Sequence, residues 1–351
     1  MPVDERNRAD AVFEGGGVKG IAFAGAIAAV EKDAGVKEWV NLAGTSAGSI
    51  VSALLVAGYD AAGLQRILAD AKYPRFADTG FGGMWIGGLY SAIFRRRGMA
   101  PGKYFKEWLN EQLAASPLAK ELGKSELTFA DVKRRDLPPR ADLPDISDEK
   151  YERAIYRLHV ITSDVTSGRL AILPDDLPNY EDENGKPFDK DSFPIVDAVR
   201  MSMSYPFLFA PVTLHHGGKP YYMVDGGLLS NFPIWLFDSP KPKRPTWGFR
   251  LHPGASVTEG LPYREIPRPL WSVPLLKAMF SAATEAWDRQ ELEQAVSART
   301  VSIPTHGIST TNFGLTRTDA DNLYSWGNDA SHAFFTSPEV QSYLGSFGKT
   351  V

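Results

Sequence analysis

A serine set between two glycines, at residues 44–48 (Gly-Thr-Ser-Ala-Gly), constrains this chain more than any other feature. The apolar run at 39–43 predicts a strand before the serine, and the apolar periodicity of 50–57 predicts a helix after it. A strand, a sharp turn and a helix in that order expose the turn serine above the helix N-terminus. Gly44 and Gly48 fit this turn because side chains there would collide. Ser46 is therefore a candidate nucleophile.

A run of glycines at residues 14–20 (Glu-Gly-Gly-Gly-Val-Lys-Gly) forms a second unusual turn. It follows a short apolar run at 11–13 and precedes a helical pattern over 21–31. Together with the strand at 39–43, this order predicts a βαβ unit with two parallel strands and a right-handed crossover. Backbone N–H groups at such a turn can bind an anion, either a phosphate or the oxyanion of a tetrahedral intermediate.

The spacing of Gly15, Gly17 and Gly20 also matches a dinucleotide-binding fingerprint. That fingerprint requires an acidic residue at the end of the second strand. Here the second strand ends in the turn that carries Ser46, which favours acyl chemistry and an oxyanion hole.

A third turn, Asp225-Gly226-Gly227, follows an apolar run at 221–224. An aspartate at a strand end can serve as general base to a serine that the fold brings close. The alternative is an ordinary hairpin, since Asp-Gly is a common turn dipeptide. A carboxylate is a weak base at its usual pKa of about 3.9, so we expect burial to raise the pKa of a catalytic Asp225.

The remaining pattern is less specific. It predicts further strands and helices at 101–113 (helix), 156–163 and 170–173 (strands), 196–202 (helix), 246–251 (strand), 275–289 (helix), 301–303 (strand) and 319–335 (helix). Surface loops are predicted at 133–150 and 174–192. Residues 81–97 combine aromatic residues, glycines and three arginines, which suits a lid that contacts a lipid–water interface. A buried connection followed by solvated arginines is the alternative.

Composition narrows the classes of protein. With no cysteine, the chain has no disulfide, thiolate nucleophile or cysteine-bound metal. A formal net charge of −4 does not favour nucleic acid as a partner. Residues 1–8 are polar, unlike a signal peptide, and no apolar run reaches the roughly 18 residues needed to span a bilayer. We expect a cytoplasmic protein that contacts membranes peripherally.

The three turns, in this order, resemble the patatin-like phospholipase family. The block at 201–206 (Met-Ser-Met-Ser-Tyr-Pro) also resembles the family's serine-and-proline segment, with Met201 where a small residue is common. The resemblance covers about residues 12–233. It implies an α/β fold, a three-layer sandwich with a mostly parallel central sheet and helices on both faces. We expect one catalytic domain over 1–351, with a motif-bearing core at about 10–235 and residues 246–351 packed on it.

The resemblance also implies a function. It implies a serine–aspartate dyad that hydrolyses fatty-acyl esters of phospholipids or acylglycerols, without histidine, metal or cofactor. By position Ser46 is the nucleophile and Asp225 its base. The oxyanion hole is assigned to Gly15, Gly16, Gly17 and Val18. The supporting glycines of the motifs are Gly20, Gly44, Gly48, Gly226 and Gly227.

Three alternatives stay open on the sequence. An α/β-hydrolase esterase would use a Ser46-Asp225-His252 triad, because His252 ends a strand-like run after the aspartate. A non-catalytic protein would use the glycine loop to bind a lipid headgroup or a nucleotide. A phospholipase that requires an activating factor would carry the same motifs as a free-standing enzyme.

Overall fold

The computed structural model describes residues 7–77, 98–144, 146–239, 242–252, 254 and 298–347. The predicted lid at 81–97 and the predicted helix at 275–289 lie outside these ranges.

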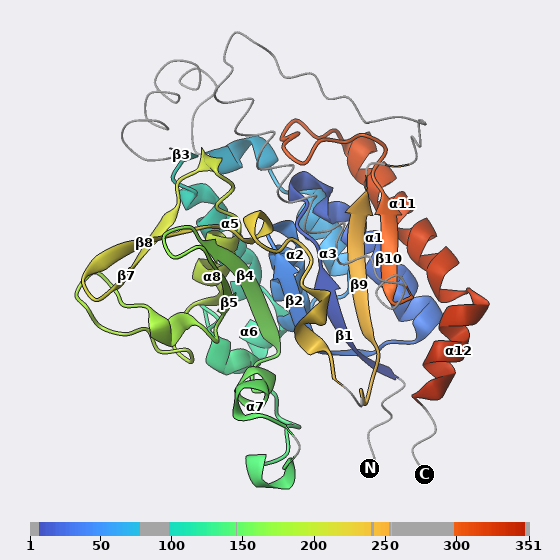
Figure 1. Cartoon of the computed structure of the whole chain (residues 1–351). Coiled ribbons are helices and arrows are strands. Elements are labelled where there is room, and N and C mark those ends of the chain that lie inside the picture. The colour runs from blue at the N-terminus through green and yellow to red at the C-terminus, as the bar shows by residue number, and fades with distance from the viewer. Residues whose placement is uncertain are drawn as a thin grey trace.

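A mixed sheet forms the centre of the molecule, and most of its strands are parallel (Figure 1). Its order is β10-β9-β1-β2-β4-β8-β7, with β5 paired to β4. The parallel part comprises β1 (Arg8–Phe13), β2 (Glu38–Thr45), β4 (Leu158–Asp164), β9 (Thr246–His252) and β10 (Thr300–Pro304). The antiparallel partners are β5 (Arg169–Leu173), β7 (Val212–His216) and β8 (Lys219–Asp225). A separate parallel pair joins β3 (Gly98–Ala100) to β6 (Phe207–Phe209).

The predicted βαβ unit is present. β1 and β2 pair in parallel, and α1 (Ile21–Ala29) connects them after the short 3₁₀ helix η2 (Gly17–Gly20). Every residue of β1 is buried, as expected for a parallel strand covered on both faces. The glycine turn and the Ser46 turn therefore follow the carboxyl ends of adjacent parallel strands, where open α/β sheets place their sites.

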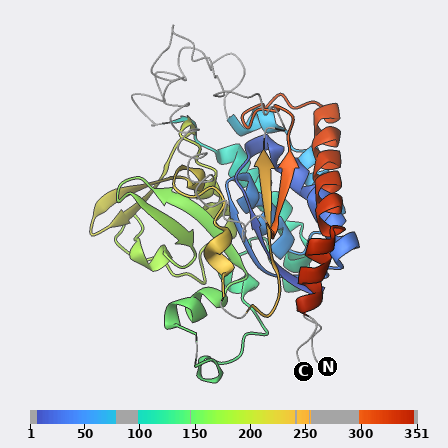
Figure 2. The same cartoon turned by 45° about the vertical axis from the view of Figure 1, so that its right-hand side comes forward.

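α-Helices pack on one face of the sheet and around its edges. They are α1, α2 (Ala47–Val56), α3 (Ala61–Ala69), α5 (Lys103–Ala114), α6 (Pro117–Leu122), α7 (Asp148–Ala154), α8 (Ile195–Ser202), α11 (Arg317–Phe335) and α12 (Pro338–Ser346). Of these, α1 and α2 pack on the strands, while α7 projects at the lower edge in Figure 1. Figure 2 shows α11 and α12 running along one side of β9 and β10.

Close approach of two helices joins the C-terminal segment to the first crossover. A side chain at Gly25 of α1 would overlap the Tyr324 carbonyl of α11, and one at Gly327 would overlap the Ala22 carbonyl of α1. The two glycines thus let the helix backbones come nearly into contact. α11 is held directly against the helix that follows the glycine turn.

The opposite face of the sheet is covered by the segment after β8. Side chains alternate along the strands, so Phe13 and Leu42 face the helices whereas Val12 and Ala43 face the other way. The second set packs with residues of the 3₁₀ helix η10 (Ile234–Phe237). The predicted three-layer α/β class with a mostly parallel sheet is confirmed.

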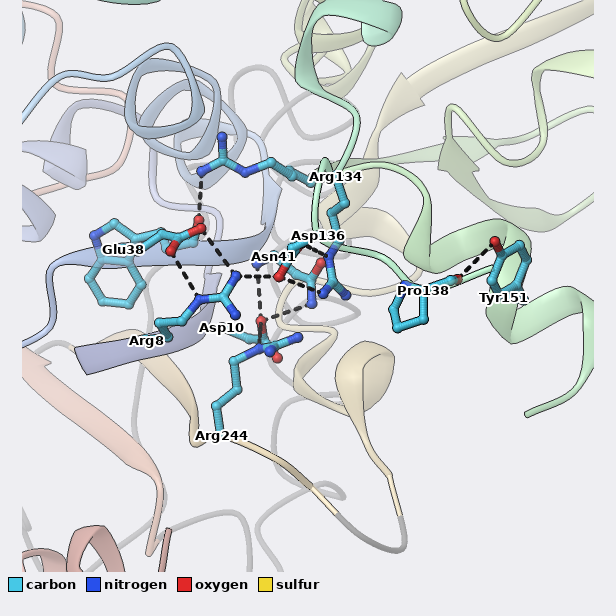
Figure 3. A network of polar contacts seen from close by, with 11 residues as sticks. Arg8, Asp10, Glu38, Asn41, Arg134, Asp136, Pro138, Tyr151 and Arg244 are labelled. Carbon is cyan, nitrogen blue, oxygen red and sulfur yellow. Dashed lines mark hydrogen bonds and ion pairs between the residues drawn. The ribbon is translucent and has the colours of Figure 1, made fainter. Parts of the chain in front are cut away.

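Charged residues secure the beginning of β1, at the far end from the glycine turn (Figure 3). Arg8 Nε donates to Glu38 Oε2 at 2.9 Å, and the same guanidinium donates to Asp136. Asp10 is buried and its Oδ1 accepts hydrogen bonds from Arg244 Nε at 3.0 Å and from Asn41 Nδ2 at 2.8 Å. β1 therefore starts earlier than the predicted residue 11, because ion pairs allow its polar residues to be buried.

Candidate active site

Ser46 occupies the turn between β2 and α2. Its backbone conformation is one that residues other than glycine rarely adopt. Its φ is 52° and its ψ is −122°, and it serves as the N-cap of α2. Such strain at a non-glycine residue is concentrated at functional sites. Side chains at Gly44 and Gly48 would overlap backbone atoms of the turn and of β1, respectively, which explains both glycines.

Polar contacts from α8 hold this turn. The Ser46 N–H donates to Ser202 Oγ at 2.8 Å, and the Ser202 hydroxyl donates to the Ile161 carbonyl at 2.6 Å. The Ser46 hydroxyl contacts Met203 Sδ at 3.5 Å. The serine-and-proline block of the sequence thus lies directly behind the candidate nucleophile.

Asp225 ends β8 beside the Ser46 turn. Thr45 Oγ1 donates to the Ser230 carbonyl at 3.2 Å, and a Cβ at Gly226 would lie 3.0 Å from Thr45 Cγ2. Asp225 Oδ1 accepts the Gly227 N–H at 2.8 Å. Its other oxygen, Oδ2, is buried and has no hydrogen-bond partner. The aspartate therefore has one oxygen fixed and one available.

Burial raises the pKa of Asp225 to about 6, against an ordinary value of 3.8. The Gly227 amide and the nearby Ser46 hydroxyl oppose this rise by favouring the ionised carboxylate. The direction agrees with the expectation for a base that must accept a proton near neutral pH.

The glycine turn lies against Ser46. A Cβ at Gly15 would be 3.3 Å from Ser46 Cβ, and Gly17 has φ +56°, a conformation that favours glycine. The three predicted turns do converge, but their amides are not equivalent. The Gly15 N–H donates to the Asn231 carbonyl and the Val18 N–H to the Thr310 carbonyl, each at 3.2 Å. In the described part of the chain only Gly16 and Gly17, of the four residues assigned to the oxyanion hole, have N–H groups without an acceptor.

Asn231 and Glu14 fasten the glycine turn to the Asp225 turn, and sequence reasoning assigned a role to neither. Asn231 Nδ2 donates to Glu14 Oε1 at 3.1 Å, and the Leu251 N–H donates to the other carboxylate oxygen of Glu14. A Cβ at Gly227 would lie 2.9 Å from Asn231 Oδ1. The only local sequence signal for a role is position: Glu14 directly precedes the glycine turn, and Asn231 closely follows the Asp225 turn.

The other sequence candidates lie elsewhere or contribute only packing. His252 Nδ1 accepts the Gly254 N–H at 3.1 Å, and burial lowers the pKa of its imidazole, with further lowering by His306, Arg250 and Lys19. No described contact joins His252 to Asp225. Gly20 packs closely against Ala47. Within the described ranges, no three acidic or histidine side chains are arranged to hold a metal ion. Nor does any helix of those ranges have the length and apolarity to cross a bilayer.

Comparison with known proteins places this arrangement in a family. The model of the patatin-like phospholipases matches residues 11–238, which include all three turns. The protein YqhO of Bacillus subtilis (strain 168) is 30% identical over 330 residues, covering 93% of this chain and 97% of its own length. This chain belongs to the patatin-like phospholipase family, and that membership supports lipid hydrolase activity and lipid substrates in general.

One solved structure, that of VipD, agrees on the fold. VipD from Legionella pneumophila superimposes with a TM-score of 0.55 at 16% identity, over 94% of this chain and 67% of VipD. The type III effector ExoU of Pseudomonas aeruginosa gives a TM-score of 0.49 at 18% identity, over 96% of this chain and 54% of ExoU.

Proposed function

We propose that the protein cleaves fatty-acyl esters of phospholipids or acylglycerols through an acyl-enzyme on Ser46, with Asp225 as general base. The observation that carries the proposal is the placement of Ser46, in a strained turn, beside a buried carboxylate whose Oδ2 has no other partner. The nucleophile needs no histidine if this carboxylate accepts its proton.

The first half-reaction forms the acyl-enzyme. Asp225 takes the Ser46 proton as Oγ attacks the ester carbonyl carbon, and the developing oxyanion accepts hydrogen bonds from Gly16 and Gly17. The tetrahedral intermediate collapses with cleavage of the ester C–O bond. Protonated Asp225 gives its proton to the leaving alcohol, so the carboxylate is regenerated.

The second half-reaction releases the fatty acid. Asp225 accepts a proton from water as the water oxygen attacks the acyl carbonyl. Collapse of this second intermediate breaks the bond to Ser46 Oγ, and Asp225 returns its proton to the serine. One carboxyl group thus serves as base and acid in both halves.

Incubation with defined phospholipids and triacylglycerols, followed by identification of the products, tests this function. We expect released fatty acid from the parent protein and none above background from Ser46→Ala. Ser52→Ala is the matched control, because Ser52 is a fully buried serine of the same helix without a hydrogen-bond partner. Unchanged hydrolysis by Ser46→Ala would overturn the proposal.

A second comparison separates the dyad from a triad. His252→Ala should retain hydrolysis within a few-fold, because no described contact joins His252 to Ser46 or Asp225. A loss as large as that of Ser46→Ala would replace the dyad with the α/β-hydrolase triad.

A further inference from the structure

A groove of about 480 Å³ lies between α3 and α5, within the size range of small-molecule sites. α3 lines it with Gly63, Arg66, Ile67 and Asp70, and α5 with Tyr104, Trp108, Gln112 and Ala115. The lining residues of each helix are three or four positions apart, so they lie on one face of that helix, which borders the groove. Tyr59, Lys72 and Lys120 complete the lining.

The cations of the groove are unpaired within the described part of the chain. Arg66, Lys72 and Lys120 are exposed, and none of them forms an ion pair or side-chain hydrogen bond with another described residue. The lining carboxylate of Asp70 is already paired with Arg317 at 3.3 Å. In a chain of formal net charge −4, three unpaired cations around one groove are complementary to an anion.

Aromatic side chains form the other half of the site. Tyr104 and Trp108 lie one turn apart on α5, and the Arg75 guanidinium lies over the Tyr104 ring at 4.4 Å from its centre. Aromatic rings next to cations suit the level of lipid headgroups, where apolar and charged surroundings meet. A small inorganic anion would not use this surface.

We propose that this groove binds the headgroup of an anionic phospholipid and holds the protein at a membrane surface. Arg66, Lys72 and Lys120 contact the phosphate and neighbouring anionic headgroups, while Ile67 and Tyr104 contact the glycerol and upper acyl region. This binding goes beyond the proposed hydrolysis and does not depend on it.

Sedimentation of the Ser46→Ala protein with vesicles tests binding without turnover, so the outcome is independent of whether the protein hydrolyses lipid. We expect binding to phosphatidylcholine vesicles that contain phosphatidylglycerol and much weaker binding to phosphatidylcholine alone. The triple change Arg66→Gln, Lys72→Gln and Lys120→Gln should weaken binding about 100-fold, at roughly 1 kcal/mol for each cation near an anionic surface. The control triple, Lys150→Gln, Lys186→Gln and Lys219→Gln, removes the same charge from exposed lysines elsewhere and should change binding less than threefold.

A variant that fills the groove distinguishes binding within the groove from general electrostatic attraction to the vesicle. Ala115→Trp leaves the charge unchanged and occupies the groove from an exposed position, so we expect it to weaken vesicle binding as well. Equal losses in both triple variants would show attraction by net charge alone and overturn the proposal. Tight binding of soluble sn-glycerol 3-phosphate together with no binding to vesicles would assign the groove to a free phosphate ligand and also overturn it.

Discussion

Asp10, near the start of β1, and Asp225, at the end of β8, are both buried, and their environments differ in one respect. Asp10 is surrounded by donors, including the Arg244 guanidinium. Asp225, beside the Ser46 turn, receives one backbone N–H and faces no cation in the described structure. Burial raises the pKa of both carboxyl groups, but the cation opposes the rise only at Asp10.

The difference indicates which of the two buried carboxylates can act as a general base. Asp10 Oδ1 already accepts three hydrogen bonds, one of them from a guanidinium, whereas Asp225 Oδ2 accepts none. A buried carboxyl group with an available oxygen and a pKa of about 6 can exchange a proton near neutral pH. We therefore interpret Asp10 as part of a clamp and Asp225 as part of the reactive site.

The largest expected effect comes from Asp225→Asn. The amide cannot accept the Ser46 proton, so we expect hydrolysis to fall on the order of 10⁴-fold, as for other losses of a general base or its partner. Initial rates with a soluble fatty-acyl ester measure the effect. Retention of even a tenth of the parent rate would end the interpretation of Asp225 as the base.

Asp10→Asn should have the opposite effect: a large loss of stability and little change in the rate of hydrolysis. It removes the carboxylate that accepts from Arg244 Nε at 3.0 Å, and breaking such a buried ion pair costs about 3–5 kcal/mol in the free energy of unfolding. Urea denaturation measures the loss, and hydrolysis at a temperature where the variant is folded should stay within a few-fold of the parent. A large rate loss with unchanged stability would reverse the roles of the two aspartates.

The pH dependence of stability sharpens the contrast. Because the native pKa of Asp225 is about 6 against an ordinary 3.8, the native state binds the proton more tightly than the unfolded state does. Stability is therefore lost as pH rises from about 4 to about 6, and the full loss of about 3 kcal/mol persists above that range. Asp225→Asn should be more stable than the parent at pH 8 and about equal at pH 4, by urea denaturation.

The same pKa predicts the activity profile. Ionised Asp225 is the active form, so kcat/KM should rise with pH and level off above about 6. A profile that is flat between pH 4 and 8 would argue against a titrating base in this range.

Ser202→Ala tests the support of the strained turn. The change leaves the buried Ser46 N–H without its acceptor, at a cost of about 1–3 kcal/mol. We expect this cost to appear mainly as a lower kcat. Ser331→Ala, which removes a fully buried hydroxyl without a partner, is the control and should leave kcat unchanged.

The smallest effect is expected from Glu38→Gln at the clamp. Glu38 is about half exposed, with a side-chain accessibility of 48%, and Arg8 keeps Asp136 as a partner. Exposed ion pairs contribute at most about 1 kcal/mol, so the free energy of unfolding should change by less than that. A loss comparable to that of Asp10→Asn would show that the whole network acts as one unit.

Much of the site follows from local sequence, because each turn carries its own steric requirement. Gly44, Gly48 and Gly17 are needed at their own positions, and the strands and helices around them have clear periodicity. The parallel pairing of β1 and β2 and the class of fold could be predicted for the same reason.

The contacts between the turns could not be predicted. The Asn231–Glu14 and Thr310–Val18 hydrogen bonds join residues far apart in the sequence, and no periodic pattern marks either pair. The Gly15 and Val18 N–H groups donate to carbonyls of distant residues and are not available to an oxyanion. The sequence therefore predicted four oxyanion donors, whereas two N–H groups, those of Gly16 and Gly17, have no acceptor in the described structure. The polar start of β1 was missed because Arg8 and Asp10 are buried only through partners from distant loops.

The position of β1 in the sheet has a consequence for synthesis on the ribosome. Its two neighbours are β2, which is made shortly afterwards, and β9, which begins at Thr246. Until β9 emerges, the nascent chain exposes an apolar strand edge, a common site of wrong pairing. The Thr310 carbonyl that holds the glycine turn emerges later still. The glycine turn should therefore reach its final geometry only after Thr310 has left the ribosome.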